Sequence, residues 1–134
     1  MPATRPDSPT DITPAVGPLT VACLCAGWCT ACQAYRATFD AVAAQWGAVR
    51  FAWIDIEAHS DALGDAALDI ENFPTLMLLR GAQPLFLGTV LPHAGTLARM
   101  VEAAQAGTLA PAGLDAGARA MAPAVDRLAR EARA

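Results

Sequence analysis

The hydrophobic pattern changes its period at Trp28, and this change most constrains the fold. Residues 19–27 (LTVACLCAG) form an apolar run that is too short for a helix and is typical of a buried strand. After Trp28, apolar residues recur at steps of three and four, which predicts an amphipathic helix from about Thr30 to Trp46. The face of this helix consists of Cys32, Tyr35, Phe39, Val42 and Trp46. The chain therefore starts its core with a strand that leads directly into a helix.

Strand and helix patterns continue to alternate through the middle of the chain. They predict a strand over 49–57, a short helix over 59–70 with Ser60 as its N-cap, two strands within 74–90 joined at Arg80–Gln83, and a helix from His93 to Ala106. Strands that alternate with helices favour parallel pairing, and a hairpin adds antiparallel strands. The predicted fold class is α/β, with a mixed central sheet flanked by helices.

The two ends of the chain differ in composition from this central part. Residues 1–18 hold five of the ten prolines and are interpreted as an extended arm without a core. Residues 19–106 form the predicted domain, which is of ordinary size for a chain of 134 residues. Residues 107–134 form an alanine-rich tail in which a short helix is predicted over 124–134, with Val125 and Leu128 as its strong apolar residues.

Charge and hydropathy exclude several classes of partner. The net charge is -4, lysine is absent and the nine arginines are dispersed, so we expect no nucleic-acid partner. No apolar run approaches the ~20 residues that a membrane helix needs, so we expect no membrane partner. The first 18 residues lack the layout of a secretory signal, which favours a cytoplasmic location. In a reducing cytosol, clustered cysteines are more often ligands or catalysts than structural disulfides.

All four cysteines lie within residues 23–32, and two of them fall where the predicted helix begins. The C-x-x-C spacing places Cys29 at the helix N-terminus, beside unpaired N–H groups and the positive end of the helix dipole. These features favour the thiolate, which is the reactive form of cysteine. Cys32 follows one helical turn later and can attack a mixed disulfide formed by Cys29. We therefore predict Cys29 as the nucleophile, Cys32 as the resolving thiol and Cys29–Cys32 as the redox disulfide.

Two alternatives concern the other two cysteines. The spacing C-x-C-x3-C-x2-C supplies four thiolates, so a zinc-binding module is one alternative. A straight strand places Cys23 and Cys25 on one face, and structural zinc usually draws its ligands from two separated knuckles, so the main prediction includes no metal. Cys23 and Cys25 are expected to be small apolar core residues. A redox role for Cys25 is kept as a second alternative.

Two segments resemble the thioredoxin family. Residues 26–35 (AGWCTACQAY) resemble its W-C-x-x-C active-site segment, and residues 72–90 (NFPTLMLLRGAQPLFLGTV) resemble its second signature, a proline before a hairpin. The resemblance covers roughly residues 20–106 and implies a thioredoxin-like fold. It also implies a disulfide oxidoreductase that acts on protein disulfides in cell redox homeostasis and electron transport. No cofactor is expected, and reducing equivalents are expected from a reductase or other electron-donor protein.

The resemblance further implies which residues contact the substrate. In the family the signature proline is cis and faces the cysteine pair, and its neighbouring backbone groups pair with the substrate chain. The residues that match these positions are Trp28, Thr30, Ala31, Phe73, Pro74 and Thr75.

The sequence departs from the family pattern in several places. Thr30 and Ala31 replace the glycine and proline between the cysteines, Cys23 replaces a buried aspartate, and Ala37 replaces a kinking proline. Glu57 is therefore the candidate for proton transfer. The family's first strand and helix are largely missing, which predicts a truncated N-terminal βα unit.

The motif contains no histidine or proline between its cysteines. This favours a reductase or isomerase over a strong oxidant. Because a fold does not settle function, a non-catalytic thioredoxin-like interaction or chaperone module is the remaining alternative.

Overall fold

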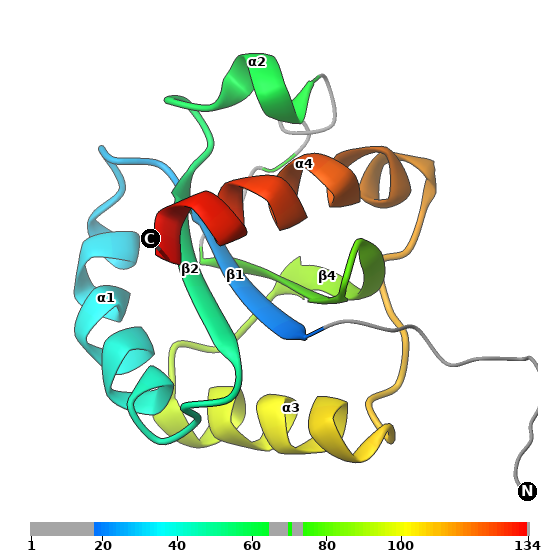
Figure 1. Cartoon of the computed structure of the whole chain (residues 1–134). Coiled ribbons are helices and arrows are strands. Elements are labelled where there is room, and N and C mark those ends of the chain that lie inside the picture. The colour runs from blue at the N-terminus through cyan, green and yellow to red at the C-terminus, as the bar shows by residue number, and fades with distance from the viewer. Residues whose placement is uncertain (1–17, 65–69, 71–73, 134) are drawn as a thin grey trace, which may run out of the picture.

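The computed structural model describes residues 18–64, 70 and 74–133 of the chain. Its elements are β1 (Leu19–Cys25), α1 (Thr30–Ala43), β2 (Arg50–Asp55), α2 (Ser60–Leu63), β3 (Thr75–Arg80), β4 (Gln83–Thr89), α3 (Ala94–Ala106) and α4 (Ala116–Arg133). The described strands form one sheet in the order β2-β1-β3-β4 (Figure 1). Strands β1 and β2 are parallel, whereas β3 is antiparallel to both β1 and β4. The predicted mixed sheet flanked by helices is confirmed.

Helices α1 and α3 cover one face of the sheet (Figure 1). The predicted stripe of α1 is buried there, namely Cys32, Tyr35, Phe39 and Val42. Side chains of β1 and β3 meet this stripe together with Leu97 and Val101 of α3. Cys23 and Cys25 belong to this same cluster, so β1 directs both sulfurs toward α1.

Helix α4 covers the opposite face of the sheet, with α2 beside it (Figure 1). Its buried residues pack against β1, β2 and β3 and are Ala118, Met121, Ala122, Val125, Leu128 and Ala129. The helix begins eight residues before the segment that the sequence suggested, and Val125 and Leu128 are buried as its apolar anchors. The C-terminal segment thus supplies one of the two helical layers.

The connections between strands position the candidate site at one end of the sheet. The hairpin between β3 and β4 turns at Gly81, whose φ of 61° favours glycine. Leu24 of β1 pairs with Thr75 of β3, and Thr75 pairs with Thr89 of β4. The end of β1, the start of β3 and the end of β4 therefore lie side by side.

The short helix expected over 59–70 differs from the structure at both ends. Helix α2 spans Ser60–Leu63 and ends at Gly64, and residues 65–69 lie outside the described residues. Ser60 is the first residue of α2, and the N-cap is His59, which makes no side-chain capping bond. The preceding turn explains the shift, because the His59 N–H donates to the carbonyl of Asp55 and winds the chain one residue earlier.

None of the described helices is both long enough and apolar enough to cross a membrane.

Candidate active site

The loop between β1 and α1 carries the candidate nucleophile. The Cys29 N–H donates to the Ala26 carbonyl at 3.0 Å, and the Gln33 side-chain amide donates to the Gly27 carbonyl at 3.0 Å. The first bond closes the loop itself, and the second connects the loop to the first turn of α1. The Cys29 carbonyl also accepts the Gln33 N–H at 3.2 Å, so backbone hydrogen bonds on both sides of Cys29 hold it at the start of α1.

Cys29 is the N-cap residue of α1. It is a free thiol, half-buried, and its side chain makes no capping hydrogen bond. The first turn of α1 contains no acidic residue, so no carboxylate offsets the positive end of the helix dipole there. Cys32 occupies the N3 position of the same turn, and side chains at N-cap and N3 lie within reach of each other.

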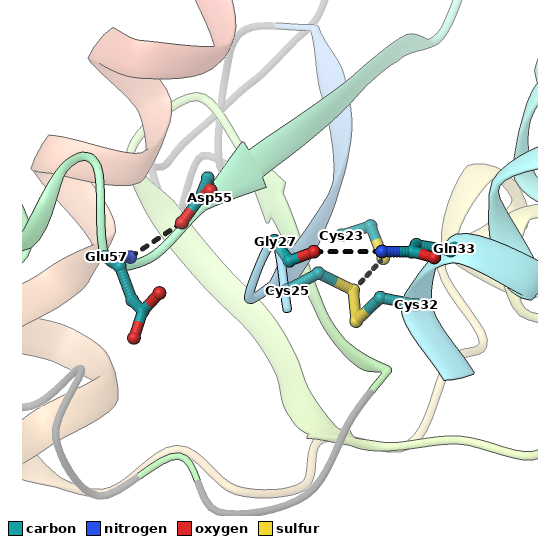
Figure 2. The surroundings of a disulfide bond; sticks show 7 residues. All are labelled: Cys23, Cys25, Gly27, Cys32, Gln33, Asp55 and Glu57. Carbon is teal, nitrogen blue, oxygen red and sulfur yellow. Dashed lines mark hydrogen bonds between the residues drawn. A yellow bond between two sulfur atoms is a disulfide. The ribbon is translucent and has the colours of Figure 1, made fainter. Parts of the chain in front are cut away.

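The structure pairs Cys32 with Cys25, whereas the sequence predicted a Cys29–Cys32 disulfide. The Cα atoms of Cys25 and Cys32 are 5.9 Å apart, which is ordinary disulfide spacing. Cys25 is the last residue of β1 and Cys32 lies on the buried face of α1, so the packing of the helix on the strand brings the sulfurs together (Figure 2). The side chains are 1% and 2% exposed respectively, so the bond is sealed from solvent.

Cys23 lies directly behind this disulfide. Its Sγ is 3.5 Å from the Sγ of Cys25, and Cys23 donates this contact because the disulfide sulfur has no hydrogen. Burial raises the pKa of the Cys23 thiol to about 12, and the charge of Arg36 offsets part of the rise. Cys23 is fully buried as expected, and it stays protonated at neutral pH.

The two carboxylates near the loop play different structural parts. Asp55 Oδ1 accepts the N–H groups of Glu57 at 2.9 Å and Ala58 at 3.2 Å, so Asp55 closes the turn after β2. Glu57 is exposed, and its Oε2 accepts the indole N–H of Trp28 at 3.0 Å. In Figure 2 Glu57 lies beside Asp55 and apart from the disulfide. The role of Glu57 in proton transfer stays a prediction, and the contact present is with Trp28.

The predicted substrate residues are distributed around this loop. Thr30 and Ala31 are exposed on the first turn of α1. Pro74 is buried, and its carbonyl accepts the N–H of Val90 at 3.3 Å. Thr75 is buried opposite Leu24, so Pro74 and Thr75 lie at the Cys25 end of β1. Phe73 lies outside the described residues.

The side chains around the site form no metal centre within the described residues. Among the described residues, no group of three or more His, Cys, Asp or Glu side chains is arranged to bind one. The zinc module of the sequence analysis thus gains no support from the arrangement of these side chains.

Comparison with known proteins identifies the family. A family model described as thioredoxin matches residues 15–101. The chain belongs to the thioredoxin family. Among curated proteins, no match to this thioredoxin-family chain was found.

Several solved thioredoxins have a similar fold. The germline-specific thioredoxin Deadhead of Drosophila melanogaster gives a TM-score of 0.56 at 20% identity, covering 66% of this chain and 82% of that chain. Fasciola hepatica thioredoxin gives the same four values. A variant thioredoxin from Halobacterium salinarum gives 0.55 at 23% identity, covering 65% of this chain and 74% of that chain. These similarities confirm the thioredoxin-like fold.

The family and the disulfide-capable cysteines together support thiol–disulfide oxidoreductase chemistry in general terms. From the sequence, a redox role for Cys25 is only an alternative to a place in the core. One signal was available in the sequence, because Cys25 is the last residue of a buried strand that leads into the active-site helix. The distance from Cys25 to Cys32, however, depends on how the helix packs on the strand.

Proposed function

We propose that this protein is a thiol–disulfide oxidoreductase that acts on disulfides of other proteins, with Cys29 as its nucleophile. The observation that carries the proposal is the free, half-buried Cys29 at the N-cap of α1, one turn before a cysteine that forms a disulfide. A thiol at a helix N-terminus beside a second redox cysteine is suited to attack a disulfide and then to be released from it.

The proposed reaction has two exchange steps. The Cys29 thiolate attacks one sulfur of the substrate disulfide, forms a mixed disulfide and releases the other substrate sulfur as a thiolate. Cys32 in its thiol form then loses its proton and attacks Cys29 Sγ. This step forms Cys29–Cys32 and releases the second substrate thiol. The cycle requires a reduced Cys32, so the Cys25–Cys32 bond must be opened before a substrate is reduced.

Exposed apolar side chains near the loop support a protein substrate. Trp28 is 66% exposed and Leu91 is 65% exposed, and they are the exposed large hydrophobic residues of the described chain. Leu91 follows Val90, which bonds to Pro74, so both side chains lie at the end of the sheet that carries Cys29. Together they offer apolar contacts to an extended polypeptide at this end of the sheet.

The partner and the direction of exchange are part of the proposal. An electron-donor protein with its own dithiol would return the site to the reduced state. Because the motif lacks a histidine between its cysteines, we propose a reductase or isomerase. A reduction potential as oxidising as about -120 mV for Cys29–Cys32 would contradict this direction.

The proposal is tested by reduction of insulin disulfides with dithiothreitol as the electron donor. We expect Cys29→Ser to lose turnover, because a hydroxyl does not form the mixed disulfide. The matched control is Cys23→Ala, which removes a buried thiol outside the proposed reaction and is expected to keep turnover. Turnover that survives in Cys29→Ser would exclude Cys29 as the nucleophile and favour another role for the fold.

A further inference from the structure

The four cysteine sulfurs lie at increasing depth, from the protein surface into the core. Cys29 is half-buried, Cys32 and Cys25 are buried, and Cys23 lies behind Cys25. Cys32 lies between the two ends of this series. It is within reach of Cys29 on the same helical turn. It is also bonded to Cys25 on the neighbouring strand, as Figure 2 shows. The sulfur of Cys32 thus has two alternative disulfide partners, Cys29 and Cys25.

We propose that Cys25 is a third redox cysteine of this site, which takes over the disulfide from Cys29–Cys32 and returns Cys29 to the free thiol. This inference deepens the proposed function and rests on it, because it takes Cys29–Cys32 as the first product of substrate reduction. In the step, the Cys25 thiol loses a proton and its sulfur attacks Cys32 Sγ. The Cys25–Cys32 bond forms, the Cys29–Cys32 bond breaks, and Cys29 leaves as a thiolate that takes up a proton. No electrons are gained or lost.

The series of exchanges ends at Cys25. Residues two apart on a strand have Cα atoms ~6.6 Å apart, near the upper limit for a disulfide. Cys23 is therefore poorly placed to bond to Cys25. Its thiol also stays protonated, because burial raises its pKa to about 12. Cys23 instead donates its S–H to Cys25 Sγ, which leaves Cys25 and Cys29 as the two competitors for Cys32.

Access to the inner disulfide runs through Cys29. Cys25 and Cys32 are 1% and 2% exposed, so an external thiol does not reach either sulfur in the folded protein. Cys29 can reverse the exchange by attacking Cys32 from the same helical turn. The Cys25–Cys32 disulfide is therefore shielded from external thiols. It exchanges with substrates and with the electron donor only through Cys29.

The inner disulfide gives the oxidised protein a distinct activity. With Cys32 held by Cys25, the free Cys29 can attack a substrate disulfide, but Cys32 cannot release the mixed disulfide. A thiolate of the substrate must release it by attacking the substrate sulfur, which forms a new substrate disulfide and frees Cys29. The substrate's disulfides are rearranged with no net change of oxidation state, so the inferred substrates are proteins with wrongly paired disulfides.

Disulfide mapping of the wild-type protein tests the exchange directly. The reduced protein is oxidised with one equivalent of oxidised glutathione, quenched with acid and alkylated with N-ethylmaleimide. Trypsin leaves all four cysteines on one peptide, because they lie between Arg5 and Arg36. Chymotrypsin cuts after Leu24, Trp28 and Tyr35 and yields residues 25–28 and 29–35 as separate peptides.

The expected result is a cross-linked pair of these two peptides with the maleimide on Cys29. A loop within residues 29–35, with no maleimide on Cys29, would overturn the inference. Cys25→Ala is expected to give only that loop, whereas Cys23→Ala is expected to give the wild-type pattern. Wild-type mapping needs no substitution, so a Cys25→Ala protein that fails to fold leaves the test intact.

A second measurement separates this inference from the proposed function. Oxidised wild-type protein is expected to rearrange scrambled ribonuclease without added thiol, and oxidised Cys25→Ala is expected to lose this activity because its Cys29 is bonded. Insulin turnover by the wild type, together with a Cys29–Cys32 loop alone, would reject the role of Cys25 and keep the oxidoreductase. Cross-linked peptides without insulin turnover or rearrangement would reject the proposed function, and with it the part assigned to Cys25 in catalysis.

Discussion

A hydrogen bond between Trp28 and Glu57 restrains the Trp28 side chain before a substrate binds. The indole N–H of Trp28 donates to Glu57 Oε2 at 3.0 Å, and the Glu57 N–H donates to Asp55 Oδ1 at 2.9 Å. The exposed ring beside Cys29 is therefore connected to the turn that closes β2. Without this connection, an exposed tryptophan would lose side-chain entropy when it binds a substrate.

We expect Glu57→Ala to raise the KM for a protein disulfide about two- to tenfold at constant kcat, the range that one hydrogen bond accounts for. Glu57→Gln is the matched control, because its amide oxygen still accepts the Trp28 N–H. Steady-state insulin reduction with both variants measures the difference. If instead both variants slow the second exchange step and shift its pH profile, Glu57 transfers protons as the sequence analysis predicted.

Tyr35 is a polar side chain on the buried face of the active-site helix α1. Its ring packs on Phe39 with centroids 6.2 Å apart, and its hydroxyl is buried with no hydrogen-bond partner within the described structure. Burial, and then the negative charge of an ionised Cys23, raises the pKa of Tyr35 to about 12 from 10.0. The unfolded chain therefore ionises first, and the contribution of Tyr35 to stability falls as the pH rises from about 10 to about 12.

We expect Tyr35→Phe to increase the free energy of unfolding by about 1 kcal/mol at pH 7, because it removes an unpaired buried hydroxyl. The increase should be larger at pH 11, where the wild type loses stability and phenylalanine does not ionise. Urea unfolding at both pH values measures it. Thr20→Val, which also removes an unpaired buried hydroxyl but no ionisable group, is the control whose effect should not grow with pH. Equal gains for Tyr35→Phe at both pH values would contradict this account.

The disulfide pairing is the part of the site that residue spacing does not predict. Residue spacing predicts Cys29 at a helix start and Cys32 one turn later, and the structure confirms both positions. Spacing does not give the distance between Cys25 and Cys32, because this distance depends on the packing of α1 against β1. The Trp28–Glu57 contact spans 29 residues and is hidden from the sequence for the same reason.

At the scale of elements, α4 begins with a defined cap. Asp115 Oδ1 accepts the Ala118 N–H at 2.9 Å, and the Asp115 carbonyl accepts the Arg119 N–H at 3.1 Å. The carboxylate also opposes the positive end of the helix dipole. Pro123 lies inside this helix, where it removes one backbone donor. The cap therefore supports a helix that has one weak point.

We expect Asp115→Ala to lower the free energy of unfolding by about 1 kcal/mol, the usual effect of losing an N-cap side chain. Asp115→Asn retains the acceptor oxygen and is expected to lose much less. Thermal and urea unfolding of the two variants measure the difference. An equal loss in both variants would assign the effect to charge instead of to the hydrogen bond.

The elements differ in how well the sequence predicts them, for a physical reason. Helix α1 has large apolar residues on its buried face, and their period of three to four predicted it. Half of the buried side chains of α4 are alanines, which occur on any helix face and mark no stripe. Ser60 has the chemistry of an N-cap, but the turn closed by Asp55 reaches α2 one residue earlier.

At the scale of the whole molecule, the sheet needs both helical layers. Ala22, Leu24, Ile54, Met77 and Leu79 of the strands form one apolar surface with α4. The family resemblance predicted that an N-terminal strand and helix are largely missing, and the layer over this surface comes from α4 and α2. Without α4, this sheet face would be a large exposed apolar patch, which promotes aggregation.

We expect Met121→Ala to lower the free energy of unfolding by about 2–5 kcal/mol, because it empties a fully buried position between α4 and the sheet. Removal of residues 115–134 is expected to give an aggregating protein without a cooperative unfolding transition. Arg127→Ala, on the exposed side of the same helix, is the control and should change stability by less than about 0.5 kcal/mol. A truncated protein that unfolds cooperatively would show that the sheet does not need α4.

The place of α4 in the chain also bears on biosynthesis. The ribosome delivers all four described strands and the redox cysteines before it delivers α4. Until then the nascent polypeptide carries an unshielded sheet and reactive thiols at the same time. Domains tend to fold as units during translation, so the fold described above forms only after α4 has emerged. A chaperone that protects the emerging chain would be needed most during that interval.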